Sequence, residues 1–464
     1  MCLAYHLLGG VVGLAARAVI RTPAPRPNGL VILRSNPVAP DPRVARVART
    51  LARAGFRVTV VAWDREGAFD EWEGATFGRI IRLRAGIGAR RAGNEYGPRR
   101  RTGHGPGQSR GRKRPRLRRS PYGTGLRKLP AFLHWQWQLL GWLLRHRNRY
   151  AIIHACDFDT LTPSVILKFV YGKRVVYDIF DWYAETVRGL PAILRRGVAR
   201  LDRWLLEKVD AVILADESRL PQLGKARPRR LEIVYNTPDW DPDDVIRGLP
   251  SRRGLRVAYI GLLQADRGLL ELLEVIGRHP EWVLDLGGFG AEEELIRDAA
   301  ATLPNVRIQG RVPHIRYMEI YARADVVVVT YDPSLLNHRY SSPNKLFEAM
   351  RLGKPVVVAE GTGVDRLVKA WRLGYVVPYG DTIRLEAALE DAAGWTREEG
   401  RAFAERVSRV YDQYFSWRMM EQRLLRVYKE MLKPIVAAGS SRESGSLPNV
   451  PDGGGEPQAG GPPE

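Results

Sequence analysis

The sequence predicts an α/β protein with two facing, Rossmann-like, doubly wound domains and a C-terminal helix that returns to the first domain. Two series of short apolar runs, alternating with segments of helical 3.6-residue periodicity, predict the strands and helices. A Pro/Asp-rich stretch at 236–253 separates the two series and marks a domain boundary. The length of 464 residues exceeds one ordinary hydrophobic core, which also favours two domains.

The composition is that of a globular but strongly basic protein. Hydrophobic residues make up 45% of the chain, and 73 Lys and Arg against 51 Asp and Glu give a net charge of +22. This charge favours polyanionic partners, namely an anionic membrane surface, nucleic acid or phosphorylated substrates. Cys2 and Cys156 are too few for a disulfide framework or a metal cluster, so we expect a cytoplasmic protein.

Residues 1–28 form a leader whose order the sequence leaves open. The apolar run from Leu7 to Ile20 is too short to span a bilayer, and it lacks the basic start of a signal peptide. The alternatives are a loosely packed leader, an interfacial segment, and a translation start that has been assigned too far upstream.

The first domain, residues 29–240, opens with a βαβ unit. We expect a strand over 30–33, a helix over 44–52 and a strand over 56–62. The loop after the first strand holds Asn36, Asp41 and Arg43, and it has no GxGxxG dinucleotide fingerprint. Ligands of such sheets bind at the carboxyl ends of the strands, so this loop should line a crevice. A structural turn stiffened by prolines is the alternative.

Residues 86–127 interrupt this pattern with a basic segment rich in Gly, Pro and Ser. Its cationic residues are Arg90, Arg91, Arg99, Arg100, Arg101, Arg110, Arg112, Lys113, Arg114, Arg116, Arg118 and Arg119. We expect a disordered insertion, because such a composition buries too little apolar surface to fold. An anionic membrane surface suits it as a partner, whereas nucleic acid is less expected because aromatic residues are sparse. A solvated loop without function is the alternative.

The rest of the first domain repeats the alternation. We expect helices over 129–147 and 191–208, and strands over 151–154, 173–177, 211–214 and 231–235. Trp135, Trp137 and Trp142 on the first helix suit either packing on the sheet or a membrane interface. Asp157 and Asp181 follow strand ends, where each could hold acceptor hydroxyls, act as a general base or cap a helix.

A linker at 241–253 leads to the second domain, residues 254–396. We expect its strands over 255–260, 283–286, 305–309, 325–331 and 356–358. Two helices over 397–433 should pack back on the first domain, and the Gly/Pro/Ser-rich residues 434–464 should be disordered.

Residues 340–355 contain the strongest candidate site. The sequence predicts a helix capped by Ser341 or Ser342, with Lys345 and Glu348 near its start. A helix N-terminus favours anions, and a nearby lysine strengthens that preference. A carboxylate one turn further on can accept hydrogen bonds from a ribose diol. An ordinary surface helix with a solvated Lys and Glu is the alternative.

An ordered set of short segments carries a family resemblance. They are Ser35-Asn36-Pro37 with Asp41-Pro42-Arg43, Ala155-Cys156-Asp157, Tyr177-Asp178 with Asp181, Gly261 with Arg267-Gly268, Gly287 to Gly290, and Ser342-Pro343-Asn344-Lys345-Leu346-Phe347-Glu348. Over about residues 29–433, the insertion apart, the chain resembles a retaining, GT-B-fold glycosyltransferase of family 4 (group 1). The resemblance implies transfer from a nucleotide-diphosphate sugar on the second domain to an acceptor on the first, with no obligatory cofactor or metal.

The resemblance also implies roles for individual residues. Arg267 and Lys345 would neutralise the diphosphate and, with Asp157, act as the catalytic residues. The implied donor-binding set is Gly261, Arg267, Gly288, Asn344, Lys345 and Glu348, and the acceptor-side set is Asn36, Asp41, Arg43, Asp157 and Asp181. Glu348 would bind the ribose. No metal ligand is implied.

Three positions depart from the family pattern. Tyr340 stands where relatives carry the first of two glutamates, Leu262 where a basic residue often follows the glycine, and Cys156 where many relatives carry histidine. The departures leave Arg267 as the better phosphate ligand.

Two other functions remain open. One is nucleic-acid binding through 86–127, and the other is a GT-B sugar-nucleotide epimerase, for which Tyr340 is the only hint. For the transferase we expect a glycan or lipid-linked acceptor in cell-envelope synthesis. The basic insertion would then hold a cytoplasmic enzyme at the inner face of the cell membrane.

Overall fold

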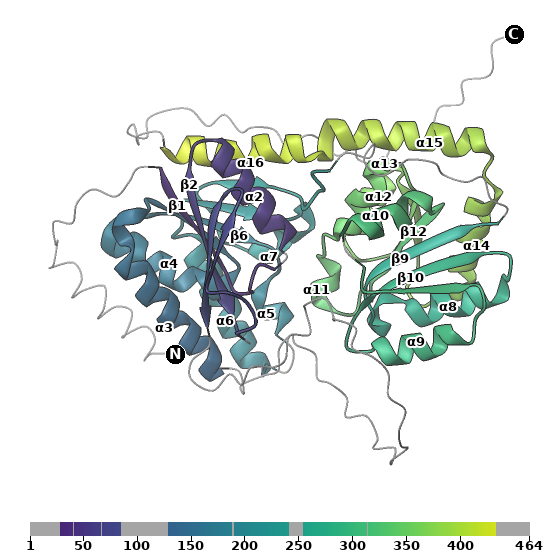
Figure 1. Ribbon diagram of the computed structural model, residues 1–464, viewed down its shortest axis with the longest axis horizontal. Coiled ribbons are helices and arrows are strands. Elements are labelled where there is room, and N and C mark those ends of the chain that lie inside the picture. Colours follow the sequence, from purple (N-terminus) through teal and green to yellow (C-terminus); the bar gives the residue numbers. More distant parts are fainter. Residues whose placement is uncertain are drawn as a thin grey trace, which may run out of the picture. The chain divides into compact units, whose positions relative to one another are not determined.

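The computed structural model describes residues 28–39, 41–65, 67–84, 129–187, 190–240, 254–312 and 314–432 (Figure 1). Contacts divide the chain into two compact units. The first extends to Asp239 and includes Ser416–Met431, and the second includes Trp240–Phe415. The predictions for the leader before Asn28, the insertion at 86–127, the linker and the tail lie outside the described residues.

The first unit is built on an 8-stranded sheet in the order β3-β4-β2-β1-β5-β6-β7-β8. Its strands are β1 (Gly29–Arg34), β2 (Arg57–Asp64), β3 (Trp72–Ala75), β4 (Gly78–Arg84), β5 (Ile152–Cys156), β6 (Arg174–Ile179), β7 (Ala211–Leu214) and β8 (Leu231–Ile233). Its helices are α2 (Pro42–Arg53), α3 (Leu129–Arg145), α4 (Phe158–Tyr171), α5 (Tyr183–Thr186), α6 (Ala192–Leu206), α7 (Leu220–Leu223) and α16 (Trp417–Leu432), with short 3₁₀ turns η2 (Arg147–Arg149) and η3 (Glu217–Arg219).

The start of this unit follows the predicted βαβ pattern. Helix α2 begins earlier than expected because the Asp41 carboxylate accepts a hydrogen bond from the Val44 amide at 3.2 Å. Pro42 fits the first helical position, where no amide hydrogen is needed. The antiparallel pair β3 and β4 was not predicted. Arginines at 79 and 82 flank the apolar residues between them, so the local sequence shows no clear strand pattern.

The second unit has a 6-stranded, wholly parallel sheet in the order β11-β10-β9-β12-β13-β14. Its strands are β9 (Arg256–Leu262), β10 (Val283–Phe289), β11 (Val306–Gly310), β12 (Val326–Val329), β13 (Val356–Ala359) and β14 (Gly374–Val377). Its helices are α8 (Leu269–Arg278), α9 (Glu293–Ala301), α10 (His314–Arg323), α11 (Leu336–Arg339), α12 (Asn344–Arg351), α13 (Val364–Trp371), α14 (Thr382–Gly394) and α15 (Arg397–Val410), with the 3₁₀ turn η5 (Ala265–Arg267) and the π-helix η6 (Tyr411–Phe415).

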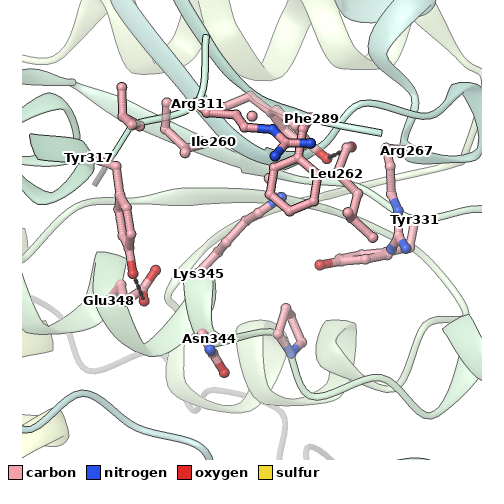
Figure 2. Close-up of a pocket in the computed structure, with 15 residues that line it drawn as sticks. Ile260, Leu262, Arg267, Phe289, Arg311, Tyr317, Tyr331, Asn344, Lys345 and Glu348 are labelled. Carbon is pink, nitrogen blue, oxygen red and sulfur yellow. Dashed lines mark hydrogen bonds between the residues drawn. The ribbon is translucent and has the colours of Figure 1, made fainter. Parts of the chain in front are cut away.

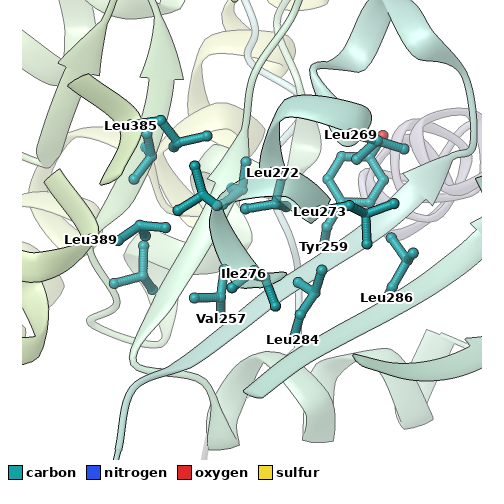
Figure 3. Packing of buried hydrophobic residues seen from close by; sticks show 14 of the residues in the cluster. Val257, Tyr259, Leu269, Leu272, Leu273, Ile276, Leu284, Leu286, Leu385 and Leu389 are labelled. Atoms are coloured by element: carbon teal, nitrogen blue, oxygen red, sulfur yellow. The ribbon is translucent and has the colours of Figure 1, made fainter. Parts of the chain in front are cut away.

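Apolar side chains from several elements of the second unit form one core (Figure 3). Val257 of β9 and Leu284 of β10 pack against Leu272 and Ile276 of α8 and Leu389 of α14, and all five are fully buried. Burial of a side chain of this size stabilises the fold by about 1.5–3 kcal/mol. The packing therefore fixes the strands whose carboxyl ends carry the candidate site.

The two closing helices belong to different units, whereas the sequence analysis assigned both to the first. Helix α15 packs on α12 in the second unit, where Gly353 leaves room for Ala404. Helix α16 packs in the first unit, where the Tyr428 hydroxyl lies 2.6 Å from Nδ1 of His154. Both helices are amphipathic, so their pattern alone does not tell which sheet each one covers.

Each sheet reverses its strand order at one point. In the first unit β1 lies between β2 and β5, and in the second β9 lies between β10 and β12. Loops at such a switch point diverge and leave a crevice at the carboxyl ends of the strands. Among the described helices, none combines the length and the apolar character needed to cross a membrane.

Candidate functional site

A pocket of about 410 Å³ lies at the switch point of the second unit (Figure 2). The carboxyl ends of β9 and β10, the residues after β11 and β12, and the start of α12 supply its walls. The lining residues are Tyr259, Ile260, Gly261, Leu262, Arg267, Gly288, Phe289, Arg311, Val312, Tyr317, Tyr331, Pro343, Asn344, Lys345 and Glu348. All six residues predicted to bind the donor are therefore brought together here.

Two glycines allow the backbone strands to approach closely beneath this pocket. A Cβ on Gly288, whose φ is +131°, would overlap the carbonyl oxygen of Gly261. A Cβ on Gly261 would lie 2.5 Å from Nζ of Lys345. The absence of both side chains lets β9 and β10 pair and leaves room for the lysine.

The Lys345 ammonium is the central charge of the pocket. Its nitrogen lies 3.7 Å from the ring centroid of Tyr259, a cation–π contact. Among the described residues, no carboxylate lies within ion-pair distance of this ammonium. Burial, together with the nearby Arg267, lowers the pKa of Lys345 well below its usual value, whereas Glu348 opposes the shift. An incoming anion would raise this pKa again.

Arg267 adds a second cation on the opposite wall. Its guanidinium lies 4.4 Å from the ring centroid of Tyr331, and its Nε is 3.3 Å from the Asp266 carboxylate. The Thr330 hydroxyl donates to the carbonyl of Arg267 at 2.6 Å, which ties the η5 turn to the end of β12. Figure 2 shows the side chains of Arg267 and Lys345 directed into the same space.

Glu348 provides the acidic group of the pocket. The residue is only 5% exposed, and the Tyr317 hydroxyl donates to its carboxylate at 2.9 Å (Figure 2). One carboxylate oxygen is thereby oriented by the protein while the residue still lines the cavity. Such a carboxylate can accept hydrogen bonds from a ligand hydroxyl.

The start of α12 differs from the prediction. Pro343 occupies the N-cap position, and no side chain bonds to the first amides of the helix. The Ser341 hydroxyl instead donates to the carbonyl of His338 at 3.1 Å, and the buried Ser342 hydroxyl has no partner. The predicted serine cap is therefore wrong. The uncapped amides beside Asn344 and Lys345 remain available to an anion.

Arg311 and Tyr317 are among the lining residues that sequence reasoning missed. The Arg311 guanidinium lies 4.3 Å from the ring centroid of Phe289, and Tyr317 orients Glu348. Arg311 directly follows the last residue of β11. Its place after a strand end was the available signal.

The predicted acceptor-side residues Asn36, Asp41 and Asp157 meet at the switch point of the first unit. Arg34 joins them: its Nε bonds to Asp41 at 2.9 Å, and its Nη1 bonds to Asp157. The Asn36 amide donates to Asp41 at 2.9 Å. Arg34, which is the last residue of β1, was not singled out from the sequence.

Asp157 has an unusual conformation and an unusual acidity. Its φ of +62° lies in the left-handed region, and its carboxylate accepts bonds from the amides of Phe180 at 2.9 Å and Asp181 at 3.3 Å. Burial raises the pKa of Asp157 to about 7, and the positive Arg34 only partly offsets this effect. A carboxyl group with this pKa can exchange a proton near neutral pH.

Two other predicted acceptor-side residues have structural partners. Arg43 is 2% exposed, and its guanidinium bonds to Asp178 at 2.7 and 3.2 Å and to the carbonyl of Val234 at 2.7 Å. Direct contact between Arg43 and an acceptor therefore does not fit this structure. Asp181 accepts a bond from Arg219 at 2.8 Å, but half of its side chain is exposed.

Cys156 ends β5 as a buried free thiol. Burial raises its pKa well above the usual value, so the thiol stays protonated. Cys156 therefore behaves here as a small apolar residue.

Two family models match the chain. Residues 254–393 match a model described as glycosyl transferases group 1, and residues 39–237 match one described as glycosyl transferase 4-like domain. Each match falls within one of the two units. The first contains the lining residues of the pocket, and the second contains Asp41 and Asp157 of the other polar cluster.

Individual relatives match over part of the chain. TuaH of Bacillus subtilis (strain 168), provisionally attributed to teichuronic acid biosynthesis as a glycosyltransferase, is 25% identical over 267 residues. That match covers 53% of this chain and 65% of TuaH, slightly less than two thirds of the relative. The phosphatidyl-myo-inositol mannosyltransferase of Mycobacterium leprae (strain TN) is 25% identical over 287 residues, which cover 59% of this chain and 74% of the relative.

Solved structures share the fold. Sucrose-phosphate synthase from Thermosynechococcus elongatus superposes with a TM-score of 0.63 at 18% identity, covering 87% of this chain and 99% of that chain. HepE of Anabaena, solved with UDP and glucose, gives a TM-score of 0.60 at 15% identity, with coverage of 87% and 99%. At these identities the likeness establishes the architecture of the units.

Proposed function

Because this chain belongs to the group 1 glycosyltransferases of the GT-B fold, we propose that it transfers a sugar from a nucleotide-diphosphate sugar to a glycan or lipid-linked acceptor. The transfer retains the anomeric configuration. The second unit binds the donor, and the first unit binds the acceptor.

One observation carries the donor assignment. The Lys345 ammonium, the Arg267 guanidinium and the uncapped amides of α12 line a single pocket, beside the buried carboxylate of Glu348. Two cations and a helix N-terminus match a diphosphate, and the carboxylate matches a ribose diol. HepE, which shares the fold, was solved with UDP and glucose, and this supports the same class of donor here.

The chemical requirement is stabilisation of the leaving group. When the bond between the anomeric carbon and the phosphate oxygen breaks, negative charge grows on the diphosphate. Lys345 and Arg267 line the pocket where that oxygen would lie, and as cations they would supply the stabilisation that a divalent cation gives in other transferases. We therefore propose that the reaction needs no metal, and that activity persists in excess EDTA.

The polar cluster of the first unit suits an acceptor hydroxyl. Asp157 has a pKa of about 7, so its carboxylate can hold a hydroxyl and accept its proton near neutral pH. Asn36, Asp41 and Arg34 fix the loop beside it. Asp181 is exposed enough to contact the acceptor. We place the enzyme in the cytoplasm, at the inner membrane face, as the location that suits a lipid-linked acceptor.

A binding screen tests the donor assignment. Wild-type protein is heated with UDP-, GDP- and ADP-sugars in turn, and one of these donors should raise its melting temperature. Glu348→Gln should reduce that shift by weakening the ribose contact, whereas the exposed Glu398→Gln should leave it unchanged. If no nucleotide sugar stabilises the wild type, the proposed function fails.

A further inference from the structure

Two helices of the first unit expose large apolar side chains to solvent. On α3, Leu129, Leu133 and Trp137 recur at four-residue spacing, and Trp137 is 74% exposed. On α6, Ile193 is 78% exposed and Leu194 is also exposed. Exposed apolar residues gathered in this way are unusual for a surface that only meets water.

The two helices are connected through α5. Phe132 of α3 contacts the ring of Tyr183 on α5 at 6.0 Å between centroids, and α5 contacts α6 (Figure 1). Residues 192–196, the first turn of α6, are each exposed. The second side of α3, with Trp135 and Leu139, is buried, so the exposed stripe is not needed for folding.

Cations outnumber acids on this face. Arg195, Arg196 and Arg200 of α6 are exposed beside the apolar residues, and neither α3 nor residues 192–201 contain an acid. The nearby acids are Asp181, which accepts a bond from Arg219, and Glu185, which accepts one from Gln222 and lies close enough to Arg195 for an electrostatic interaction. Trp, Leu and Ile combined with an excess of arginines match the interface of an anionic bilayer.

We propose that α3 and the first three turns of α6 form a docking face for an anionic lipid surface. Alternative occupants suit this charge less well. A second copy of the face would bring arginines against arginines. Residues 1–27 and 86–127 of this chain are themselves cationic, with Glu95 the one acid among them, so they repel the face as well.

The docking face also suggests where a lipid-linked acceptor would meet the enzyme. This link to the acceptor rests on the proposed function, whereas the docking face itself does not. The Trp135 indole and the Gln136 amide of α3 donate to the carbonyl of Asp159 at 3.0 and 2.6 Å. Helix α3 is thus bonded to the first turn of α4, which directly follows Asp157. A lipid surface on this face would present the head group of a lipid-linked acceptor to the polar cluster that we assign to the acceptor.

Vesicle flotation of the full chain tests the docking face. Wild-type protein should float with vesicles of phosphatidylcholine and phosphatidylglycerol, and less with phosphatidylcholine alone or at high salt. Ile193→Gln combined with Arg196→Gln should reduce partitioning by about tenfold or more, because it removes an apolar anchor and a charge. Trp137→Gln should have a similar effect.

Matched control variants come from exposed residues elsewhere. Ile383 is 76% exposed and precedes the exposed Arg384 on α14, so Ile383→Gln with Arg384→Gln should float like the wild type. Phe169→Gln on α4, at a residue 54% exposed, is the counterpart of Trp137→Gln. Unchanged thermal unfolding of each variant without vesicles shows that the fold is retained.

Several outcomes would overturn the docking face. They are flotation of the α6 variant at the wild-type level, equal binding to both kinds of vesicle, and a binding loss that requires deletion of 86–127 rather than these substitutions. A wild-type dimer that the α6 variant disrupts without vesicles would assign the face to a second copy instead. The donor-induced thermal shift is measured in parallel: vesicle binding without any donor shift contradicts the proposed function and leaves the docking face standing.

Discussion

At the scale of single residues, Lys345 shows how its surroundings prepare a side chain for a ligand. Burial and Arg267 lower the pKa of its ammonium, and Glu348 opposes them. A diphosphate would lie closer to the ammonium than any described carboxylate does. Binding should therefore raise the pKa of Lys345, so that the complex holds a proton that part of the free protein has lost.

We predict that binding of UDP, or of the diphosphate of whichever donor the screen identifies, takes up protons at neutral to alkaline pH. The affinity should fall as pH rises, because the free lysine then loses its proton before the complex does. Calorimetry in buffers of different ionisation enthalpy measures the uptake. Lys345→Met should abolish it and weaken binding by about 2 kcal/mol. Lys369→Met, at an exposed lysine paired with Glu360, is the control.

Proton uptake that persists unchanged in Lys345→Met would contradict this assignment.

Single residues also show which features could be predicted from the sequence and which could not. The positions of Lys345, Glu348 and Gly261 could be predicted from the sequence. Gly261 lies at the end of a recognisable strand, and Lys345 and Glu348 lie near a recognisable helix start. The Ser341 cap was wrong because the proline at 343 takes the N-cap position and leaves the first amides uncapped. The buried pairing of Arg43 with Asp178 could not be foreseen, because 134 residues of chain separate the two.

At the scale of elements, the pairing of β9 with β10 depends on glycines with different tasks. Gly288 has a φ of +131°, and its missing side chain makes room for the backbone of the neighbouring strand. Gly261 makes room for the end of a flexible side chain. The same substitution at these two positions should therefore have different consequences.

We predict that Gly288→Ala lowers the free energy of unfolding by about 3 kcal/mol or more, because backbone must move. Gly261→Ala should keep the fold and weaken donor binding, because only the Lys345 side chain must shift. Urea unfolding and the donor thermal shift measure the two effects. Gly394→Ala, with no atom within 4 Å of the added Cβ, is the control. Equal stability losses at 261 and 288 would contradict this distinction.

Elements with clear periodicity could be predicted and others could not. The buried strand β12 and the helix α12 were predicted to within a few residues, because their apolar spacing is regular. The β3–β4 pair and α13 were missed. These elements are short and contain charged residues, so tertiary contacts rather than the local sequence pattern determine their structure.

At the scale of the whole molecule, the sequence indicated two sheets with sites at their strand ends. The reversal of strand order in each sheet explains why motifs far apart along the chain meet in each unit. The division of α15 and α16 between the units depends on which core each helix completes. The local sequence pattern of a helix does not indicate which core it completes.

Acceptor-dependent transfer is the most direct test of the molecule as a whole. Wild-type protein with the identified labelled donor and a membrane lipid extract is followed in excess EDTA for label entering the lipid or glycan fraction. The wild type should transfer sugar, and Lys345→Ala and Arg267→Ala should each slow transfer by about a hundredfold or more, since each removes a charge that stabilises the leaving group. Arg384→Gln is the control. Transfer at the wild-type rate by both variants would contradict the donor site described for the second unit.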